Sequence, residues 1–176
     1  MSDNFSILLV LKGREGYTMR LMSYFNAIHF PYPIVVADGG KDTRIRSFFE
    51  DLKRWPNIRY DYRHYGYDRT LDDFHNKMSL AVERIETPLV SVMDNDDFIF
   101  LKGIEFLKDN EGYSSTRGMI QSAHISRDVI GDLRIGDNMY KQHPDSIVAS
   151  SASDRMIEQT KRFHGNWHNI TRSNHI

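Results

Sequence analysis

The sequence predicts an α/β fold: a single three-layer α/β/α domain built on a mainly parallel sheet. Over residues 1–100, apolar runs of strand length alternate with segments whose apolar residues recur every three or four positions. Such an alternation of strands and helices is typical of a parallel sheet with helical crossovers. The strand runs are also apolar at successive positions, as in strands that are buried on both faces.

Composition bounds the kind of protein. The chain has 176 residues, of which 40% are hydrophobic and 12% aromatic, so we expect one globular domain over residues 1–176. A net charge of -1 gives no general attraction to nucleic acid or to anionic membranes. The absence of cysteine excludes disulfides and thiolate metal sites. The near-neutral charge leads us to expect no nucleic-acid partner. No apolar run approaches the roughly 20 residues of a membrane span, so we expect no membrane span and a cytoplasmic protein.

The first predicted strand is the apolar run Phe5–Leu11, and a loop at residues 12–16 with two glycines and two cations follows it. A glycine-containing loop that opens a helix can present backbone N–H groups and the Arg14 side chain to a phosphate. The alternative is an ordinary strand-to-helix turn. The helix that follows is predicted from Thr18 to just before Pro31, with apolar residues at helical spacing.

The second predicted strand, residues 33–37, is stopped by Asp38 and two glycines. An acid at the carboxyl end of a strand in a nucleotide-binding fold can accept hydrogen bonds from a base or a ribose hydroxyl. A plain Asp-Gly turn is the alternative. A helix from about Thr43 to before Trp55 and a short strand at residues 58–62 come next. The aromatic segment at residues 60–67 suits stacking on a flat ring, or else forms a half-exposed edge strand.

The third predicted helix begins at Thr70, which with Asp73 makes a capping pair ahead of apolar residues spaced every three or four positions up to Ile85. Lys77 lies on this helix. Its amine could reach toward a phosphate, and the alternative is a solvated surface lysine.

A fourth apolar run, residues 88–93, ends in the acids Asp94, Asp96 and Asp97. If the backbone stays extended, Asp94 and Asp96 leave the same face and can converge on one cation, while Asp97 points elsewhere. Carboxylate oxygens are ligands for the hard cations Mg²⁺ and Mn²⁺, which are commonly held together with substrate phosphates. The alternative is an acidic turn that caps the next helix.

Beyond Phe100 the patterns are weaker. They predict a short helix at residues 103–110, a strand at 119–125, an irregular polar region at 126–150 and a helix at 153–163, with a further strand-like segment at 167–172.

Two stretches together resemble the nucleotide-sugar half of GT-A-fold glycosyltransferases, close to the family-2 group. They are Val-Val-Ala-Asp-Gly-Gly at residues 35–40 and Thr-Pro-Leu-Val-Ser-Val-Met-Asp-Asn-Asp-Asp at residues 87–97, and the resemblance spans roughly residues 5–100. It implies a Rossmann-like, nucleotide-sugar-binding half at residues 1–100 and a partial acceptor-side half at 101–176.

The resemblance also implies roles for single residues. Asp38 would contact the nucleotide base, Asp96 would bind the metal directly, and Asp94 would bridge ribose and metal. Arg14 and Lys77 occupy regions that contact nucleotide or phosphate. The sequence departs from the family pattern where the first strand ends in Leu-Lys-Gly-Arg at residues 11–14, and where Ala37 replaces a second acid.

We therefore expect a metal-dependent glycosyltransferase, using Mn²⁺ or Mg²⁺, that moves a sugar from a nucleoside diphosphate sugar to an acceptor hydroxyl, for example of a glycan or a lipid-linked acceptor. The alternatives are a nucleotide-sugar binding module or catalytically incomplete fragment and, further off, a sugar nucleotidyltransferase. No catalytic residue is assigned. The family places its catalytic carboxylate after the strand that residues 167–172 resemble, and residues 173–176 include no acid, so we expect poor turnover of acceptor.

Overall fold

The computed structural model describes residues 4–41 and 44–108, with the shorter stretches 115–116, 121–125, 133–138, 150–151, 153–155, 157–158 and 170–172. The chain divides into two compact units. The first comprises residues 1–116 and 167–176, and the second comprises residues 117–166. Within the described residues, no helix combines the length and the apolar character needed to cross a membrane.

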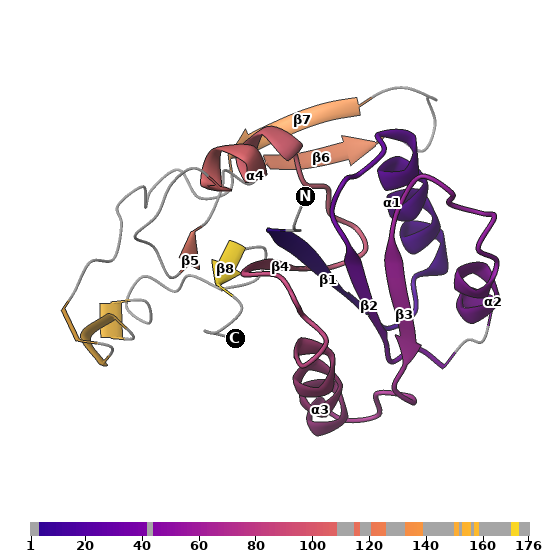
Figure 1. Cartoon of the computed structure of the whole chain (residues 1–176), viewed down its shortest axis with the longest axis horizontal. Helices are drawn as coiled ribbons and strands as arrows, with labels where there is room; N and C mark the ends of the chain where they lie inside the picture. The colour runs from indigo at the N-terminus through magenta and orange to yellow at the C-terminus, as the bar shows by residue number, and fades with distance from the viewer. Residues whose placement is uncertain are drawn as a thin grey trace. The chain divides into compact units, whose positions relative to one another are not determined.

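The first unit is organised on a sheet whose described strands have the order β3-β2-β1-β4-β8-β5 (Figure 1). The first four of these pair in parallel, while β8 is antiparallel to both β4 and β5. The predicted α/β class with a mainly parallel sheet is therefore confirmed. The strands are β1 (Phe5–Leu11), β2 (Ile34–Asp38), β3 (Tyr60–His64), β4 (Leu89–Met93), β5 (Ser115–Thr116) and β8 (Ile170–Arg172).

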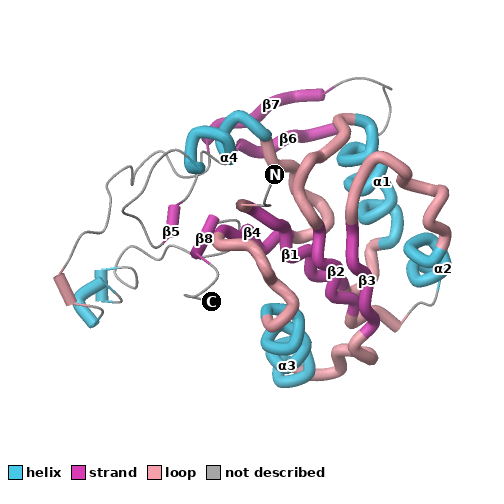
Figure 2. Tube along the Cα trace, viewed as in Figure 1, coloured by secondary structure: helices cyan, strands magenta, loops and turns pink. Residues whose placement is uncertain are grey.

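Helices cover both faces of this sheet, as the three-layer prediction requires (Figure 2). Buried residues of α1, α2 and α4 belong to one apolar cluster, and Ala81 of α3 belongs to the cluster on the opposite face. Strands β2 and β3 lie on one side of β1, whereas β4 lies on the other side. The helix between β3 and β4 therefore crosses to the opposite face of the sheet. The helices are α1 (Glu15–Ala27), α2 (Arg44–Glu50), α3 (Leu71–Val82) and α4 (Leu101–Lys108).

Strand β1 is the centre of the core, since all seven of its residues are buried. Successive side chains leave opposite faces of a strand. Accordingly Phe5, Ile7, Leu9 and Leu11 join the cluster beneath α1 and α2, whereas Leu8 and Val10 join the cluster beneath α3. Burial of each such side chain contributes about 1.5–3 kcal/mol to folding. An apolar strand without polar alternation is stable only at this central position.

Some predicted boundaries differ from the structure. Helix α1 begins three residues before Thr18, because Arg14 already accepts the first helical hydrogen bonds through its carbonyl oxygen. Strand β3 begins at Tyr60 rather than residue 58 because its ladder with β2 begins at the pair of Ile34 and Tyr60. Helix α4 begins two residues before the predicted position 103.

The second unit contains β6 (Gln121–Ile125) and β7 (Leu133–Asn138), which pair antiparallel. The strand expected at 119–125 is present at 121–125, and residues 119 and 120 lie outside the described residues. The expectation of an irregular region is wrong at 133–138, where Gly136 and Asp137 lower the strand propensity and only backbone pairing with β6 reveals the strand. Residues 153–155 and 157–158 are helical, and the rest of the predicted helix at 153–163 lies outside the described residues. The prediction of a single domain over 1–176 stays a prediction.

The predicted cap of α3 is present as a reciprocal pair of hydrogen bonds. The Thr70 hydroxyl oxygen accepts from the Asp73 N–H at 3.2 Å, and the Asp73 carboxylate accepts from the Thr70 N–H at 2.9 Å. The hydrogen bonds that the Asp73 carboxylate accepts from the Thr70 N–H and the Thr70 hydroxyl lower the pKa of Asp73 below its ordinary value, because they stabilise the ionised form.

We predict that Thr70→Ala lowers the free energy of unfolding by about 1 kcal/mol at pH 7, because it removes an N-cap acceptor. The Asp73 carboxylate contributes above its ordinary pKa, and its contribution is lost as the pH falls below about 4. The variant Asp73→Asn should therefore lose this pH dependence. Urea unfolding between pH 3 and pH 7 measures both effects. A Thr70→Ala variant as stable as the wild type at pH 7 would contradict the assigned cap.

Candidate functional site

The carboxyl ends of the parallel strands lie at one edge of the sheet. Leu11 of β1, Asp38 of β2 and His64 of β3 stand in one register row, and β4 ends at Met93, the partner of Leu9. Since β2 and β4 lie on opposite sides of β1, the direction of the crossover connections reverses between β1 and β4. In open α/β sheets such a reversal creates a crevice outside the strand ends where ligands bind.

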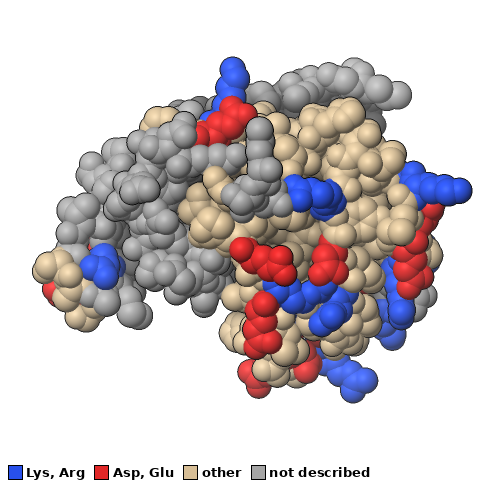
Figure 3. Space-filling view, viewed as in Figure 1, with Lys and Arg blue, Asp and Glu red and all other residues tan. Residues whose placement is uncertain are grey.

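Two loops lie at this reversal point. The loop after β1 carries Gly13 and Arg14, and the loop after β4 carries the acids Asp94, Asp96 and Asp97. The structure thus brings the predicted site residues Arg14, Asp94 and Asp96 together, with Asp38 at the same edge one strand away. On the face shown in Figure 3, acidic and basic side chains are interspersed, so the exposed charge there is mixed.

The three acids after β4 form one cluster. A carboxylate oxygen from each of Asp94, Asp96 and Asp97 lies within 4.8 Å of the others. The expectation that Asp97 points elsewhere is wrong, because it assumed an extended backbone, whereas β4 ends at Met93 and the chain turns at residues 95 and 96. Beyond the strand the alternation of side chains no longer holds, and three carboxylates face a common point.

Arg14 places a cation beside this cluster. Its guanidinium contacts the Asp96 carboxylate at 2.6 Å, with side chains that are 60% and 38% exposed. An ion pair so accessible to water contributes at most about 1 kcal/mol to stability, so its main effect is on the charge at the site. Arg14 is the N-cap residue of α1, and its backbone angles are left-handed, with φ at 59°, which is uncommon outside glycine.

Asn95 connects the two loops, and sequence reasoning did not single it out. Its side-chain amide is buried and donates toward the carbonyl oxygens of Gly13 and Arg14 at 3.2 and 3.3 Å, and toward the Thr18 hydroxyl at 2.9 Å. No sequence pattern marked it, because it lies beyond the end of β4, where the alternation of side chains no longer holds. This amide holds the loop after β1 against the acidic cluster.

Asp38 is fully buried, and each of its carboxylate oxygens accepts a hydrogen bond. One oxygen accepts from the Gly40 N–H at 2.7 Å, and the other accepts from the Tyr62 hydroxyl at 2.7 Å. Burial raises the pKa of Tyr62, and the hydrogen bond to Asp38 raises it further, so this hydroxyl remains a donor. The first bond is typical of an Asp-Gly turn. Contact between Asp38 and a nucleotide base stays a prediction.

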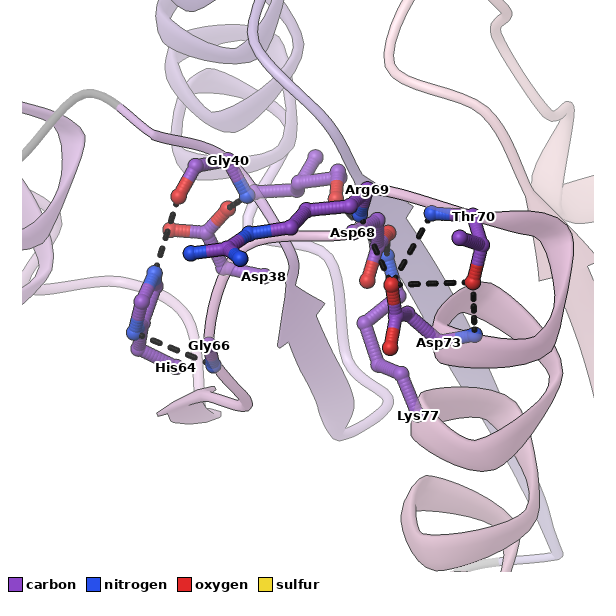
Figure 4. Close-up of polar contacts among 10 residues, drawn as sticks. Asp38, Gly40, His64, Gly66, Asp68, Arg69, Thr70, Asp73 and Lys77 are labelled. Atoms are coloured by element: carbon purple, nitrogen blue, oxygen red, sulfur yellow. Dashed lines mark hydrogen bonds and ion pairs between the residues drawn. The ribbon is translucent and has the colours of Figure 1, made fainter.

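His64 completes the turn formed by residues 38–40, which we call the 38–40 turn. Its Nε2 lies 2.9 Å from the Gly40 carbonyl oxygen, and its Nδ1 accepts from the Gly66 N–H at 3.3 Å (Figure 4). Since Nδ1 is the acceptor, Nε2 carries the proton and donates to Gly40.

Lys77 and Asp68 form a buried ion pair at the same edge. Each residue is 2% exposed, and the Lys77 amine lies 2.5 Å from the Asp68 carboxylate and 2.9 Å from the Leu11 carbonyl oxygen. The alternative of a solvated lysine is therefore wrong. The predicted phosphate contact of Lys77 stays a prediction. Asp68 was missed because it lies in the loop before α3, where no periodic pattern marks it.

A surface hollow of about 420 Å³ lies beside the free edge of β3, between that strand and α2. It is lined by polar and aromatic side chains that include Arg46, Tyr62 and His64. Tyr62 links this hollow to Asp38, but none of the predicted site residues lines it.

No protein-family model matches the sequence, and no curated protein matches it. Among solved structures, the chain is similar to TarS from S. aureus. TarS in complex with UDP is 20% identical with a TM-score of 0.46, covering 60% of this chain and 32% of that one. TarS in complex with UDP-GlcNAc is 18% identical with a TM-score of 0.42, covering 60% and 30%. The match thus spans about a third of these TarS chains. With TM-scores below 0.5, it defines neither the activity nor the site of this chain.

Gly39 has no room for a side chain. A Cβ added there would lie 2.2–2.3 Å from the atoms of the Asp68 carboxylate. We predict that Gly39→Ala lowers the free energy of unfolding by about 1–3 kcal/mol, because the buried ion pair must move. Gly103→Ala in α4 is the matched control, since a Cβ there meets nothing within 4 Å, and it should raise stability by up to about 1 kcal/mol. Equal stability of the two variants in urea unfolding would contradict the close packing of Gly39 against Asp68.

Proposed function

We propose that this chain binds a nucleoside diphosphate sugar, together with Mn²⁺ or Mg²⁺, at the carboxyl edge of its parallel sheet and transfers the sugar to an acceptor hydroxyl. The observation that carries the proposal is the convergence of three carboxylates with Arg14 at the reversal point between β1 and β4. This is where open α/β folds bind nucleotides, and the mixture of acids and a cation suits a metal-bound diphosphate.

The donor set fits the proposed metal. Asp94 and Asp96 would hold it, and the oxygen of Asp97 lies close enough to share in the site. Oxygen ligands of this kind favour Mg²⁺ and Mn²⁺ over softer metals. When bound, such a cation supplies charge neutralisation to the leaving diphosphate.

The chain's own residues would orient the donor. Helix α1 begins directly after Arg14, and the N–H groups at a helix N-terminus favour phosphate oxygens. Arg14 adds a flexible cation at this position, and the Asn95 amide fixes the loop that carries it. The 38–40 turn, one strand away, would face the nucleoside part of the donor. A glycan or a lipid-linked acceptor is part of the proposal, with the acceptor base unassigned.

A screen with purified protein tests the proposal. We expect UDP, CDP, ADP or GDP, or a sugar conjugate such as UDP-GlcNAc, to raise the melting temperature in the presence of Mn²⁺ and not in its absence. A ligand at 100 times its dissociation constant stabilises the folded state by about 2.7 kcal/mol, which such a screen detects easily. Hydrolysis of the donor sugar then separates a transferase from a binding module. Failure of every nucleotide to bind would refute the proposal.

We predict that Asp96→Ala weakens Mn²⁺-dependent binding of the best nucleoside diphosphate at least tenfold, and that Asp94→Ala weakens it less. The free energy of unfolding should change by less than about 0.5 kcal/mol, because the acids lie in an accessible loop. Calorimetric titration measures the affinity. Glu105→Gln, which alters an exposed carboxylate of α4 outside the cluster, serves as the control. Unchanged affinity in Asp96→Ala would show that the metal assignment is wrong.

A further inference from the structure

We infer that Lys77 and Asp68 form a positioning pair that fixes the 38–40 turn, and that Lys77 affects ligand binding through this turn rather than by touching phosphate. The ligand part of this inference rests on the proposed function. The structural part concerns contacts within the chain and can be tested without a ligand.

The contacts of Lys77 connect three segments that are distant in sequence. From α3 its amine donates to the Leu11 carbonyl oxygen at the end of β1 and to the Asp68 carboxylate in the loop after β3. It also lies 5.1 Å from the centre of the Phe74 ring, which favours a cation over the ring face. Figure 4 shows Lys77 reaching back from α3 toward Asp68. The amine is thus enclosed by its partners.

Asp68 passes this constraint to the turn. Its backbone N–H donates to the Gly39 carbonyl oxygen at 3.0 Å, and its carboxylate fills the space where a side chain at position 39 would lie. The Gly39 N–H in turn donates to the Leu11 carbonyl oxygen at 2.9 Å, the same oxygen that Lys77 contacts. Gly39 is therefore held on two sides, by β1 and by Asp68.

The turn then sets the position of Asp38 and Gly40. With Gly39 fixed, the Gly40 N–H donates to the Asp38 carboxylate, and the Gly40 carbonyl oxygen accepts from His64. Each of these bonds depends on the path of the backbone through Gly39. Loss of the ion pair should therefore loosen the turn before it affects the acidic cluster, which is held separately by Asn95.

Burial argues against a direct phosphate contact. At 2% exposure the amine could reach a ligand only by leaving Asp68, and this would strand a carboxylate that is itself 2% exposed. An unpaired buried charge is strongly unfavourable, whereas the exposed Arg14 can turn to a ligand at little cost. The two cations at this edge thus have different tasks.

The structural test uses Lys77→Met, Asp68→Asn and the double variant. We expect amide hydrogen exchange at Gly39 and Gly40 to be at least tenfold faster in Lys77→Met, while exchange at Leu9 in the centre of β1 is unchanged. The double variant should melt at a higher temperature than Lys77→Met alone, because it leaves no unpaired buried charge. It also provides a folded protein if a single variant fails to fold.

The control is Lys53→Met, which alters an exposed lysine after α2. Unchanged exchange at both glycines would overturn the inference.

The ligand test compares uridine with UDP, and the other nucleosides with their diphosphates, in the presence of Mn²⁺. A positioning role predicts that Lys77→Met weakens the binding of the nucleoside and of the diphosphate by the same factor. The double variant should then recover part of the lost affinity. A loss confined to the diphosphate would mean that Lys77 touches phosphate, and would overturn the inference. If the wild type binds no nucleotide, the proposed function fails, and the exchange measurement still decides whether the pair fixes the turn.

Discussion

The parallel pairing of β1 with strands on both of its sides is the constraint on which the site depends. Because β1 is apolar on both faces, it is stable only in the centre of the sheet, between β2 and β4. Parallel pairing then directs all neighbouring strand ends to one edge. The loop after β1, the 38–40 turn and the acids after β4 come from three separate parts of the chain, and this arrangement brings them to the same edge.

The edge has two parts with different physical character. At the reversal point the charged groups are accessible: Arg14 and Asp96 are 60% and 38% exposed, so they can exchange partners with a ligand at small cost. Next to it the charged groups are buried and fully engaged: Asp38 accepts two hydrogen bonds, and Lys77 is paired with Asp68. The accessible part suits chemistry on a charged ligand, and the buried part keeps the backbone that borders it in one conformation.

The elements that have a strong periodic pattern could be predicted from sequence. The apolar run of β1 and the capping pair of α3 each determine a local structure that the rest of the fold does not change. Side chains beyond the end of a strand could not be predicted in this way. Asp97 joins the cluster and Asn95 turns inward because the chain turns after Met93, where strand alternation no longer applies.

The burial of Lys77 had a usable signal, since this residue lies three positions after Phe74 on the apolar stripe of α3. Its partner Asp68 lies in a loop where no pattern indicates burial.

The central claim is that the acids after β4 and the loop after β1 form one cation site at the sheet edge. Titration with Mn²⁺, followed by paramagnetic broadening of backbone amide signals, tests it most directly. The claim predicts that the signals of Gly13, Arg14, Asp96 and Asp97 broaden first and together, before those of other exposed acids such as Glu50. Broadening that is spread evenly over exposed acids, or that spares Gly13 and Arg14, would contradict it.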